Sequence, residues 1–416
     1  MARDHSIVNI SLPGGNVITT SPVTHRTSTP LSPHVLVIGG GVTGLVTSWV
    51  LLDRGYRVTI LSKAWANKSA SSRLTSQIAG ALWEYPPAVC GSHTDEVSLR
   101  RSKEWAMDSY HAWQALARSD IAKEVGVKMV RSAFFFATSV KDDEKQMEKM
   151  LEIQGSGVQG FQHSPSIISE MGVDPKCGAA DAYELLAPAI DSDQAMHWLM
   201  DLVQSKGARL VTEELHDDLV LLEQSLRARF RADAIVNCTG LASLTLANDS
   251  KCYPLRGGLL RYINDGSKVP KIEHALSISA DANAAGEIVF IVPRNDNTLV
   301  VGGYAQPDEY ELNKNSKSST VQRMRERAVE FLPELRKMEL DPVYPFAQGL
   351  RPARKGNVRL ERETRKSRST IVHSYGHGGS GWSFSFGCAA EVADIVGGII
   401  AEGRQRQNRD MIRARL

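Results

Sequence analysis

The sequence predicts an α/β fold with a discontinuous Rossmann-like dinucleotide-binding domain and a second, strand-rich α+β domain. Three observations support this prediction. A short apolar run, Val35–Ile38, ends in glycines at Gly39, Gly41 and Gly44. An apolar pattern with helical spacing follows these glycines. Short runs typical of buried parallel strands recur near both ends and in the middle of the chain, and a strand-rich region over 253–304 interrupts them.

The glycines follow the pattern G-x-G-x-x-G between a strand and a helix. In such a turn the first glycine, Gly39, makes the tight bend, and Gly41 lets a pyrophosphate approach the backbone. The third, Gly44, lets the helix pack on the strand. The phosphates lie at the helix N-terminus, where Val42 and Thr43 stand. The pattern predicts dinucleotide binding; the alternative is a glycine-rich turn in another α/β fold.

The remaining elements follow from the pattern of apolar residues. A repeat of 3.6 residues predicts a helix, and a short continuous apolar run predicts a buried strand. In chain order we expect a strand over 34–38, a helix over 42–52 closed by Gly55, a strand over 57–61, helices over 96–118, 140–155 and 195–205, a strand over 208–212, a buried strand that ends in a turn over 234–240, strands over 259–262, 287–292 and 298–301, a helix over 317–331, a strand over 370–374, and a final helix over 384–402.

Bulk properties narrow the class of protein. A chain of 416 residues suggests two or more domains, and a net charge of +2 gives no reason to expect nucleic acid as a partner. The five cysteines are scattered, with no pair spaced for zinc, so we expect buried thiols in a reducing compartment and no metal site. No apolar run reaches the length of a membrane span, so we expect no membrane partner.

The two ends of the chain carry separate expectations. Residues 1–33 are polar and rich in Ser, Thr and Pro, which predicts a flexible extension and not a secretory signal. The last three residues, Ala414-Arg415-Leu416, are similar to the S-K-L peroxisomal address, and the basic Arg409 and Arg413 precede them. They predict a peroxisomal import receptor as a partner and a peroxisomal location; the alternative is a cytoplasmic location.

One position departs from the pattern of NAD-binding proteins. The strand over 57–61 is followed by Ser62 and Lys63, where an acidic residue would hold the ribose hydroxyls of NAD. Lys63 offers a positive charge to a ribose or phosphate edge instead. An NAD-dependent dehydrogenase is therefore a minor alternative.

Five segments resemble the D-amino-acid oxidases, a family of FAD-dependent enzymes. They are 35–45, 76–83, 236–240, 349–354 and 375–381. The resemblance implies a p-hydroxybenzoate-hydroxylase-like fold with bound FAD. It also implies oxidation of neutral or basic D-amino acids to imino acids, with hydride transfer from Cα to the flavin and reduction of O2 to H2O2. The implied partners are a small-molecule substrate and O2.

The resemblance implies the following division of the chain. The FAD-binding domain takes 34–95, 195–252 and 345–405, the substrate domain takes 96–194 and 253–344, and 406–416 form a C-terminal tail. A homodimer is compatible with the sequence.

Three residues are expected at the reacting centre from the resemblance. Arg351 matches the arginine that pairs with the substrate carboxylate, a role suited to a planar, permanently charged guanidinium. Gly379 matches the position whose carbonyl accepts from the substrate amine. Phe290 stands where the family has a tyrosine, so one hydroxyl donor is lost, at a cost to carboxylate binding of about 1 kcal/mol.

The resemblance also places FAD contacts along the chain. The expected cofactor-binding residues are Gly39, Gly41, Val42, Thr43, Gly44, Lys63, Thr75, Ser76, Gly80, Ala81, Leu82, Leu215, Thr239, Gly378, Gly379, Ser380, Gly381, Trp382 and Ser383. The Ser383 hydroxyl is expected near the flavin C2 oxygen, with an N-cap role as its alternative.

Other positions bear on the substrate. A family tyrosine on the active-site lid has no counterpart over 277–285, and Glu84 stands where a neutral amide is common. A carboxylate there would favour a cationic side chain and disfavour D-aspartate. His377 is expected to be buried and hydrogen-bonded, with no part in proton transfer. The alternatives are a specialised oxidase of a secondary metabolite or of another amine or alcohol, and a non-catalytic FAD-binding protein.

Overall fold

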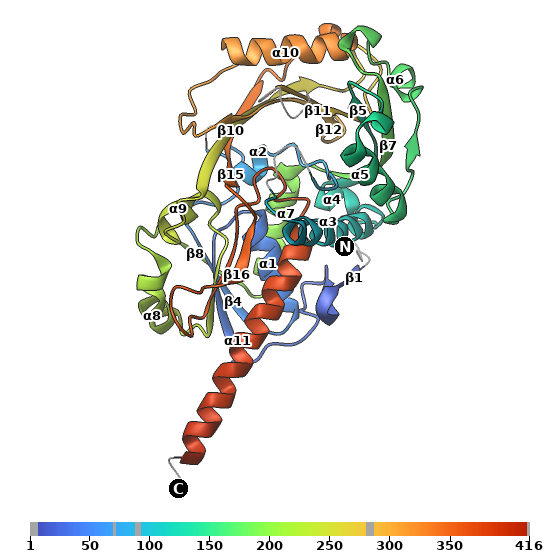
Figure 1. Ribbon diagram of the computed structural model, residues 1–416. Helices are drawn as coiled ribbons and strands as arrows, with labels where there is room; N and C mark the ends of the chain where they lie inside the picture. Colours follow the sequence, from blue (N-terminus) through green and yellow to red (C-terminus); the bar gives the residue numbers. More distant parts are fainter. Residues whose placement is uncertain (1–6, 70–71, 88–92, 280–286, 414–416) are drawn as a thin grey trace, which may run out of the picture.

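The computed structural model describes residues 7–69, 72–87, 93–279 and 287–413 of the chain. Two large sheets form its two halves, and α11 (Ser385–Arg413) runs along one of them to the C-terminus (Figure 1). Within these described ranges no helix is both long and apolar enough to cross a bilayer. The predicted α/β architecture is confirmed.

The first sheet has six strands in the order β16-β17-β9-β3-β4-β8. All neighbours are parallel except β16 and β17. The strands are β3 (His34–Ile38), β4 (Arg57–Ser62), β8 (Arg209–Thr212), β9 (Ala234–Asn237), β16 (Arg359–Arg362) and β17 (Ile371–Tyr375). Segments from the N-terminus, the middle and the C-terminal part thus meet in one sheet, as the predicted discontinuous Rossmann-like arrangement requires.

The second sheet is mixed and has nine strands, with the path β14-β10-β13-β12-β11-β5-β7-β6 and β15 paired to β10. Its strands are β5 (Val127–Phe136), β6 (Gln162–His163), β7 (Asp181–Ile190), β10 (Cys252–Ile263), β11 (Ala275–Ser279), β12 (Glu287–Pro293), β13 (Thr298–Tyr304), β14 (Gln306–Pro307) and β15 (Phe346–Arg354). One face packs on α10 (Ser319–Phe331) through Met324, Ala328 and Phe331. The other face is directed toward the first sheet.

Helices fill the space between and around the sheets. Buried α1 (Val42–Asp53) packs against α11 and α7 (Ser192–Ser205), and α11 packs against α3 (Glu96–Ala117). The remaining helices are α2 (Thr75–Ile78), α4 (Ala122–Val125), α5 (Glu144–Gly155), α6 (Ile167–Glu170), α8 (Leu219–Phe230) and α9 (Ser243–Leu246).

The prediction of a flexible N-terminal extension is wrong for residues 9–19. Strands β1 (Asn9–Leu12) and β2 (Asn16–Thr19) form an antiparallel hairpin whose Ile10 and Ile18 are buried in the main core. The Asp53 carboxylate, at the end of α1, accepts hydrogen bonds from the backbone N–H of Thr19 at 2.8 Å and of His25 at 2.9 Å. Apolar burial and this buried carboxylate together hold the segment in place.

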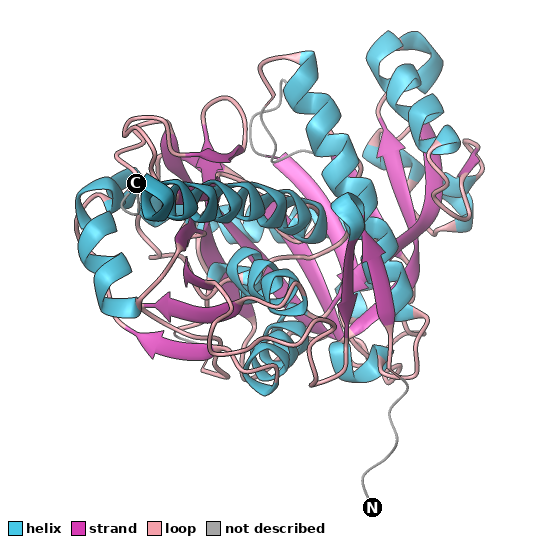
Figure 2. Ribbon diagram, turned by 90° about the horizontal axis from the view of Figure 1, so that it is seen from below, coloured by secondary structure: helices cyan, strands magenta, loops and turns pink. Residues whose placement is uncertain are grey.

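Two further boundaries differ from the prediction. Strand β15 was expected in the FAD-binding domain, but its whole length pairs with β10 of the second sheet. Helix α11 continues through the expected tail to Arg413, and residues 401–411 are exposed. This end projects away from the molecule in Figure 1 and lies in front of it in Figure 2, seen from below. The helix is rich in good helix formers, which sustain it without packing.

Candidate functional site

A cavity of about 550 Å³ lies where the carboxyl ends of β3, β4, β8, β9 and β17 face β10 and β15. The carboxyl edge of a parallel sheet is where ligands of such folds bind. Most of the predicted site residues line it: Gly39, Gly41, Val42, Thr43, Lys63, Thr75, Ser76, Gly80, Leu215, Thr239, Arg351, Gly378, Gly379, Gly381 and Trp382.

Six predicted residues lie behind this lining. Ala81 has a left-handed backbone (φ 52°), and its carbonyl accepts from the Ile190 N–H at 3.0 Å. The other five are Gly44, Leu82, Phe290, Ser380 and Ser383. Of these, Gly44, Leu82, Ser380 and Ser383 are buried. Ser383 precedes α11, which begins at Ser385 and not at residue 384. The individual cofactor contacts stay predictions.

The glycine turn has the close approaches that a dinucleotide site needs. Gly39 has a φ of +118°, and a Cβ there would lie 2.3 Å from the Cys238 carbonyl oxygen. A Cβ at Gly44 would lie 1.9 Å from the Gly39 carbonyl oxygen, so only glycine lets α1 approach β3 this closely. Gly41 is the N-cap residue of α1, and the Ser76 hydroxyl accepts from the Val42 N–H at 3.1 Å. The other N–H groups of the first helical turn have no intrahelical partner, so this helix end is an anion site that fits the pyrophosphate of FAD.

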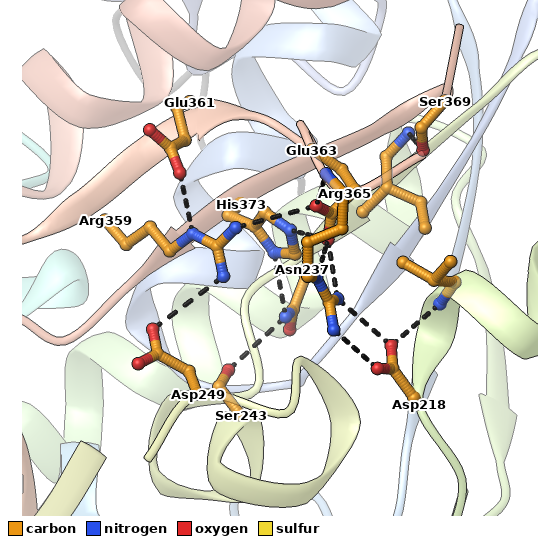
Figure 3. A network of polar contacts seen from close by, with 12 residues as sticks. Asp218, Asn237, Ser243, Asp249, Arg359, Glu361, Glu363, Arg365, Ser369 and His373 are labelled. Atoms are coloured by element: carbon orange, nitrogen blue, oxygen red, sulfur yellow. Dashed lines mark hydrogen bonds and ion pairs between the residues drawn. The ribbon is translucent and has the colours of Figure 1, made fainter. Parts of the chain in front are cut away.

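The second turn of the cavity, Thr239–Gly240, is fixed by buried Asn237. The Asn237 Oδ1 accepts from the Thr239 N–H at 3.1 Å and from the Thr239 hydroxyl at 2.8 Å. Because these bonds fix the oxygen, the Asn237 NH2 group is directed at His373 Nδ1 (3.2 Å) and the Ser243 hydroxyl (3.3 Å) (Figure 3). His373 Nδ1 therefore accepts, and its Nε2–H donates to Glu363 at 3.1 Å.

This chain of contacts continues to the surface of the first sheet (Figure 3). Burial alone would raise the pKa of Glu363, but hydrogen bonds from His373 and Arg365 lower it below its usual range. Arg365 also pairs with Asp218 at 2.6 Å. The Thr239 turn is thus held by a polar network that spans β9, β17 and the segment after β16, which keeps the cavity wall rigid.

Arg351 projects from β15 into the cavity and lies directly on β10. A Cβ at Gly257 would lie 2.0 Å from Arg351 Nη1 and 2.6 Å from Nη2, so the guanidinium packs against the bare Gly257 backbone. Its Nη1 donates to the Tyr304 carbonyl at 3.3 Å. Among the described residues no carboxylate pairs with Arg351, and its remaining N–H donors are free for an anionic ligand.

The loop after β17 lies beside Arg351. The Gly378 N–H donates to the carbonyl of Pro352, the residue that follows Arg351, at 3.0 Å. Gly379, exposed to the cavity, comes next. Arg354 forms an ion pair with Asp249 at 2.8 Å, so its charge is already partnered within the protein. Two segments distant in sequence thus present a cationic side chain and backbone carbonyls to one space.

Phe290 packs on the backbone of the cavity wall. A Cβ at Gly80 would lie 2.2 Å from the Phe290 ring, so the ring covers Gly80, which lines the cavity. The expected lid region over 277–285 lies mostly outside the described residues. Tyr310, from the loop after β14, lines the cavity instead and is 54% exposed.

Two expectations about polar side chains need correction. His377 is buried, as predicted, and burial lowers its pKa to about 4, but its Nε2 has no hydrogen-bond partner within the described part of the chain. Glu84 is paired with Lys149 at 3.7 Å and does not line the cavity. Burial raises the pKa of Glu84, which Lys149 only partly offsets. The argument against D-aspartate that rested on Glu84 therefore fails.

Sequence reasoning missed many cavity residues, and three of them carry polar side chains that bear on ligand binding. Glu213 and Glu214 follow β8 directly, and Tyr310 lies in the loop between β14 and α10. The two acidic residues had a usable signal, since they stand at the carboxyl end of a strand predicted to be parallel. Tyr310 had none, because the course of a loop of this length is not set by local pattern.

Comparisons with known proteins agree with this geometry. A family model described as FAD dependent oxidoreductase (DAO) matches residues 34–395. A D-amino-acid oxidase of Rubrobacter xylanophilus is 28% identical over 368 residues, covering 88% of this chain and 97% of the relative. A D-amino-acid oxidase of Streptomyces coelicolor is 29% identical over 370 residues, covering 87% and 96%.

A solved structure shares the fold. Glycine oxidase from Geobacillus kaustophilus superposes with a TM-score of 0.67 at 18% identity, covering 88% of this chain and 95% of that chain. The resemblance found in the sequence is confirmed at the level of the family, and so is its cofactor, FAD. Because the family model spans most of the chain, the protein belongs to the DAO family of FAD-dependent oxidoreductases.

Proposed function

We propose that the protein is an oxidase that dehydrogenates neutral or basic D-amino acids to imino acids and reduces O2 to H2O2. The imino acid then reacts with water to give a 2-oxo acid and ammonia. The observation that carries the proposal is Arg351, a guanidinium inside the cofactor cavity with no carboxylate partner among the described residues. The names of the two relatives support the substrate class.

The residues of this chain bind and orient the substrate. Arg351 receives its carboxylate in a two-point contact, which fixes two of its atoms. The carbonyl of Gly379 accepts from the substrate amine, and the Pro352–Gly378 hydrogen bond keeps this carbonyl near Arg351. When bound, FAD supplies the two-electron oxidising chemistry. The protein contributes position and electrostatics, since a carboxylate and an amine that are both held leave Cα with one orientation.

The side-chain preference follows from what faces the substrate space. Tyr310 lines the cavity with an aromatic ring, and no second cation beside Arg351 stands among the described residues from β10, β15 and the 376–381 loop that line the cavity. An acidic side chain would therefore lose its hydration without gaining a partner there. Neutral and basic side chains carry no such penalty at an aromatic wall.

The test is an anaerobic titration of the flavin absorbance with neutral, basic and acidic D-amino acids. We expect bleaching by the neutral and basic members, reversed by air with release of H2O2. The variant Arg351→Lys keeps the charge but loses the bidentate fork, so turnover should fall at least 100-fold while flavin stays bound. Unchanged catalytic efficiency in this variant would refute the carboxylate role.

A second candidate keeps the cofactor and changes the substrate. Phe290 removes a hydroxyl at the position where the family has a tyrosine, which favours a specialised oxidase of a secondary metabolite or of another amine or alcohol. A yellow protein that no D-amino acid bleaches, but that another amine or alcohol reduces, would support this candidate.

Location and assembly are separate proposals. We propose peroxisomal import through Ala414-Arg415-Leu416, which lie outside the described residues. A fluorescent reporter carrying this tripeptide at its C-terminus should collect in peroxisomes, and a diffuse reporter would refute the address. We also propose a homodimer, to be tested by light scattering of the purified holoenzyme.

A further inference from the structure

Two carboxylates lie at the end of the cavity where β4 and β8 finish. Glu213 and Glu214 follow β8, and both line the cavity together with Lys63, which follows β4. The two strands are parallel neighbours with Ser62 opposite Thr212, and the Glu213 N–H donates to the Ser62 carbonyl at 3.0 Å. This pairing brings the Glu214 and Lys63 side chains together.

The two carboxylates differ in what they contact. Both oxygens of Glu213 accept from Arg229, at 2.7 and 2.6 Å, in a bidentate ion pair. Within the described part of the chain Glu214 has one polar side-chain contact, with Lys63 Nζ at 3.4 Å, and its side chain is 54% exposed. Glu214 therefore keeps most of its acceptor capacity, whereas that of Glu213 is largely used by Arg229.

In a Rossmann-like fold a carboxylate is expected at the carboxyl end of the second strand, which is β4 here. In the NAD-binding form of the fold, an acidic residue after the second strand accepts hydrogen bonds from ribose hydroxyls. Lys63 occupies that position here, and an ammonium group has no acceptor. Because Lys63 Nζ contacts Glu214 at 3.4 Å, a carboxylate from the neighbouring strand lies beside the side chain that occupies the usual acidic position.

We propose that Glu214 accepts hydrogen bonds from the ribose hydroxyls in the adenosine half of bound FAD. Lys63 acts as a positioning residue that holds the carboxylate at the cavity edge. A carboxylate suits this ligand because its two oxygens can accept from two neighbouring hydroxyls at once. The inference rests on FAD as the cofactor and does not depend on which substrate the enzyme oxidises.

The test compares flavin affinity in two matched variants of the full-length holoenzyme, Glu214→Ala and Glu213→Ala. Fluorescence of flavin released on dilution gives the dissociation constant without any turnover. We expect Glu214→Ala to raise it about tenfold or more, the effect of losing a hydrogen bond to a charged group. Glu213→Ala should change it less than about threefold, since this carboxylate is engaged by Arg229.

A second measurement identifies the group that Glu214 contacts. The bound flavin is exchanged for an FAD analogue whose adenosine ribose lacks the 2′-hydroxyl. The wild type should bind the analogue several-fold more weakly than FAD, whereas Glu214→Ala should bind the two alike. Equal FAD affinity in Glu214→Ala and wild type would overturn the inference. An equal loss with the analogue in both proteins would also overturn it, because the carboxylate would then contact another group, such as the adenine amine.

The two proposals fail in different ways. A holoenzyme that binds FAD through Glu214 but oxidises no D-amino acid would refute the substrate and leave this inference standing. Full turnover of D-amino acids, combined with unchanged flavin affinity in Glu214→Ala, would do the reverse.

Discussion

The substitution Gly257→Ala tests whether the position of Arg351 governs turnover. Gly257 does not have a left-handed backbone, so alanine can adopt its conformation without strain. The added Cβ would lie 2.0 Å from Arg351 Nη1, where an ordinary contact needs at least 3.4 Å, and the difference requires a shift of about 1.4 Å. The guanidinium is the free end of a flexible side chain and can swing away at little cost in stability.

The cost of Gly257→Ala should appear in catalysis instead. A displacement of about 1 Å at a substrate-positioning group can cost roughly 100-fold in rate, or about 2.7 kcal/mol. We therefore expect kcat/KM for D-amino acids to fall about 100-fold, with the flavin spectrum and the thermal midpoint little changed.

The matched control for Gly257→Ala is Gly349→Ala. Gly349 is the residue opposite Gly257 in the β10–β15 ladder, and the nearest atom to its added Cβ would be the Ile78 Cδ1, at 3.2 Å. Steady-state kinetics on both variants decide the matter. If Gly257→Ala keeps kcat/KM within threefold of wild type while flavin stays bound, the contact between Gly257 and Arg351 does not govern turnover, and the prediction is wrong.

Three further predictions concern the cavity mouth, a buried histidine and a buried ion pair. Tyr310→Ala should raise KM more for bulky D-amino acids than for D-alanine, because the ring lines the cavity; equal increases would count against contact with the side chain. Burial lowers the pKa of His377 to about 4 in the folded protein, against about 6.5 in the unfolded chain. Between these pH values the unfolded chain binds more protons than the folded protein does. The free energy of unfolding therefore falls by up to about 3 kcal/mol as the pH drops from 6.5 to 4. Urea unfolding of His377→Asn should show a flatter pH dependence, and an unaltered slope would contradict this. Lys206→Met should lower the free energy of unfolding by about 3–5 kcal/mol, because it removes the counter-charge of the fully buried Asp53 carboxylate, which lies 2.8 Å from Lys206 Nζ. A loss under 1 kcal/mol would mean that the backbone N–H donors suffice to stabilise the carboxylate.

The parts of the fold that the sequence predicts well are those fixed by local pattern. The strand, glycine turn and helix over 34–53 could be predicted, because Gly39 and Gly44 stand where the backbone conformation or a close backbone contact requires glycine. The sequence does not predict the N-terminal hairpin, because the overall polarity of residues 1–33 favours an extension, although apolar and polar residues alternate in β1. Its anchor, Asp53, lies 34 residues from Thr19 and has no local signature.

The candidate site likewise has one part that local sequence pattern predicts and another part that it does not. The FAD cradle depends on backbone approach, which glycines report directly, so its outline follows from the sequence. The surroundings of Arg351 depend on residues from separate strands and loops: Gly257, on which its guanidinium packs, comes from β10, and Tyr310 comes from the loop after β14. No local pattern links these residues, because only the second sheet brings them together.

Local sequence pattern therefore specifies the cofactor site of this protein more directly than it specifies the substrate site. Strands β10 and β15 present Arg351 on the cavity side, while Arg256 and Gln348, from the same two strands, fasten the loop that carries Tyr310. The Arg256 Nη1 donates to the Glu311 carbonyl at 2.6 Å, and the Gln348 Nε2 donates to the Leu312 carbonyl at 2.8 Å. The carboxylate site and the wall that faces the substrate side chain thus share one support. A change in this loop can therefore alter which side chain fits without moving Arg351, so substrate choice can vary on a constant cofactor site.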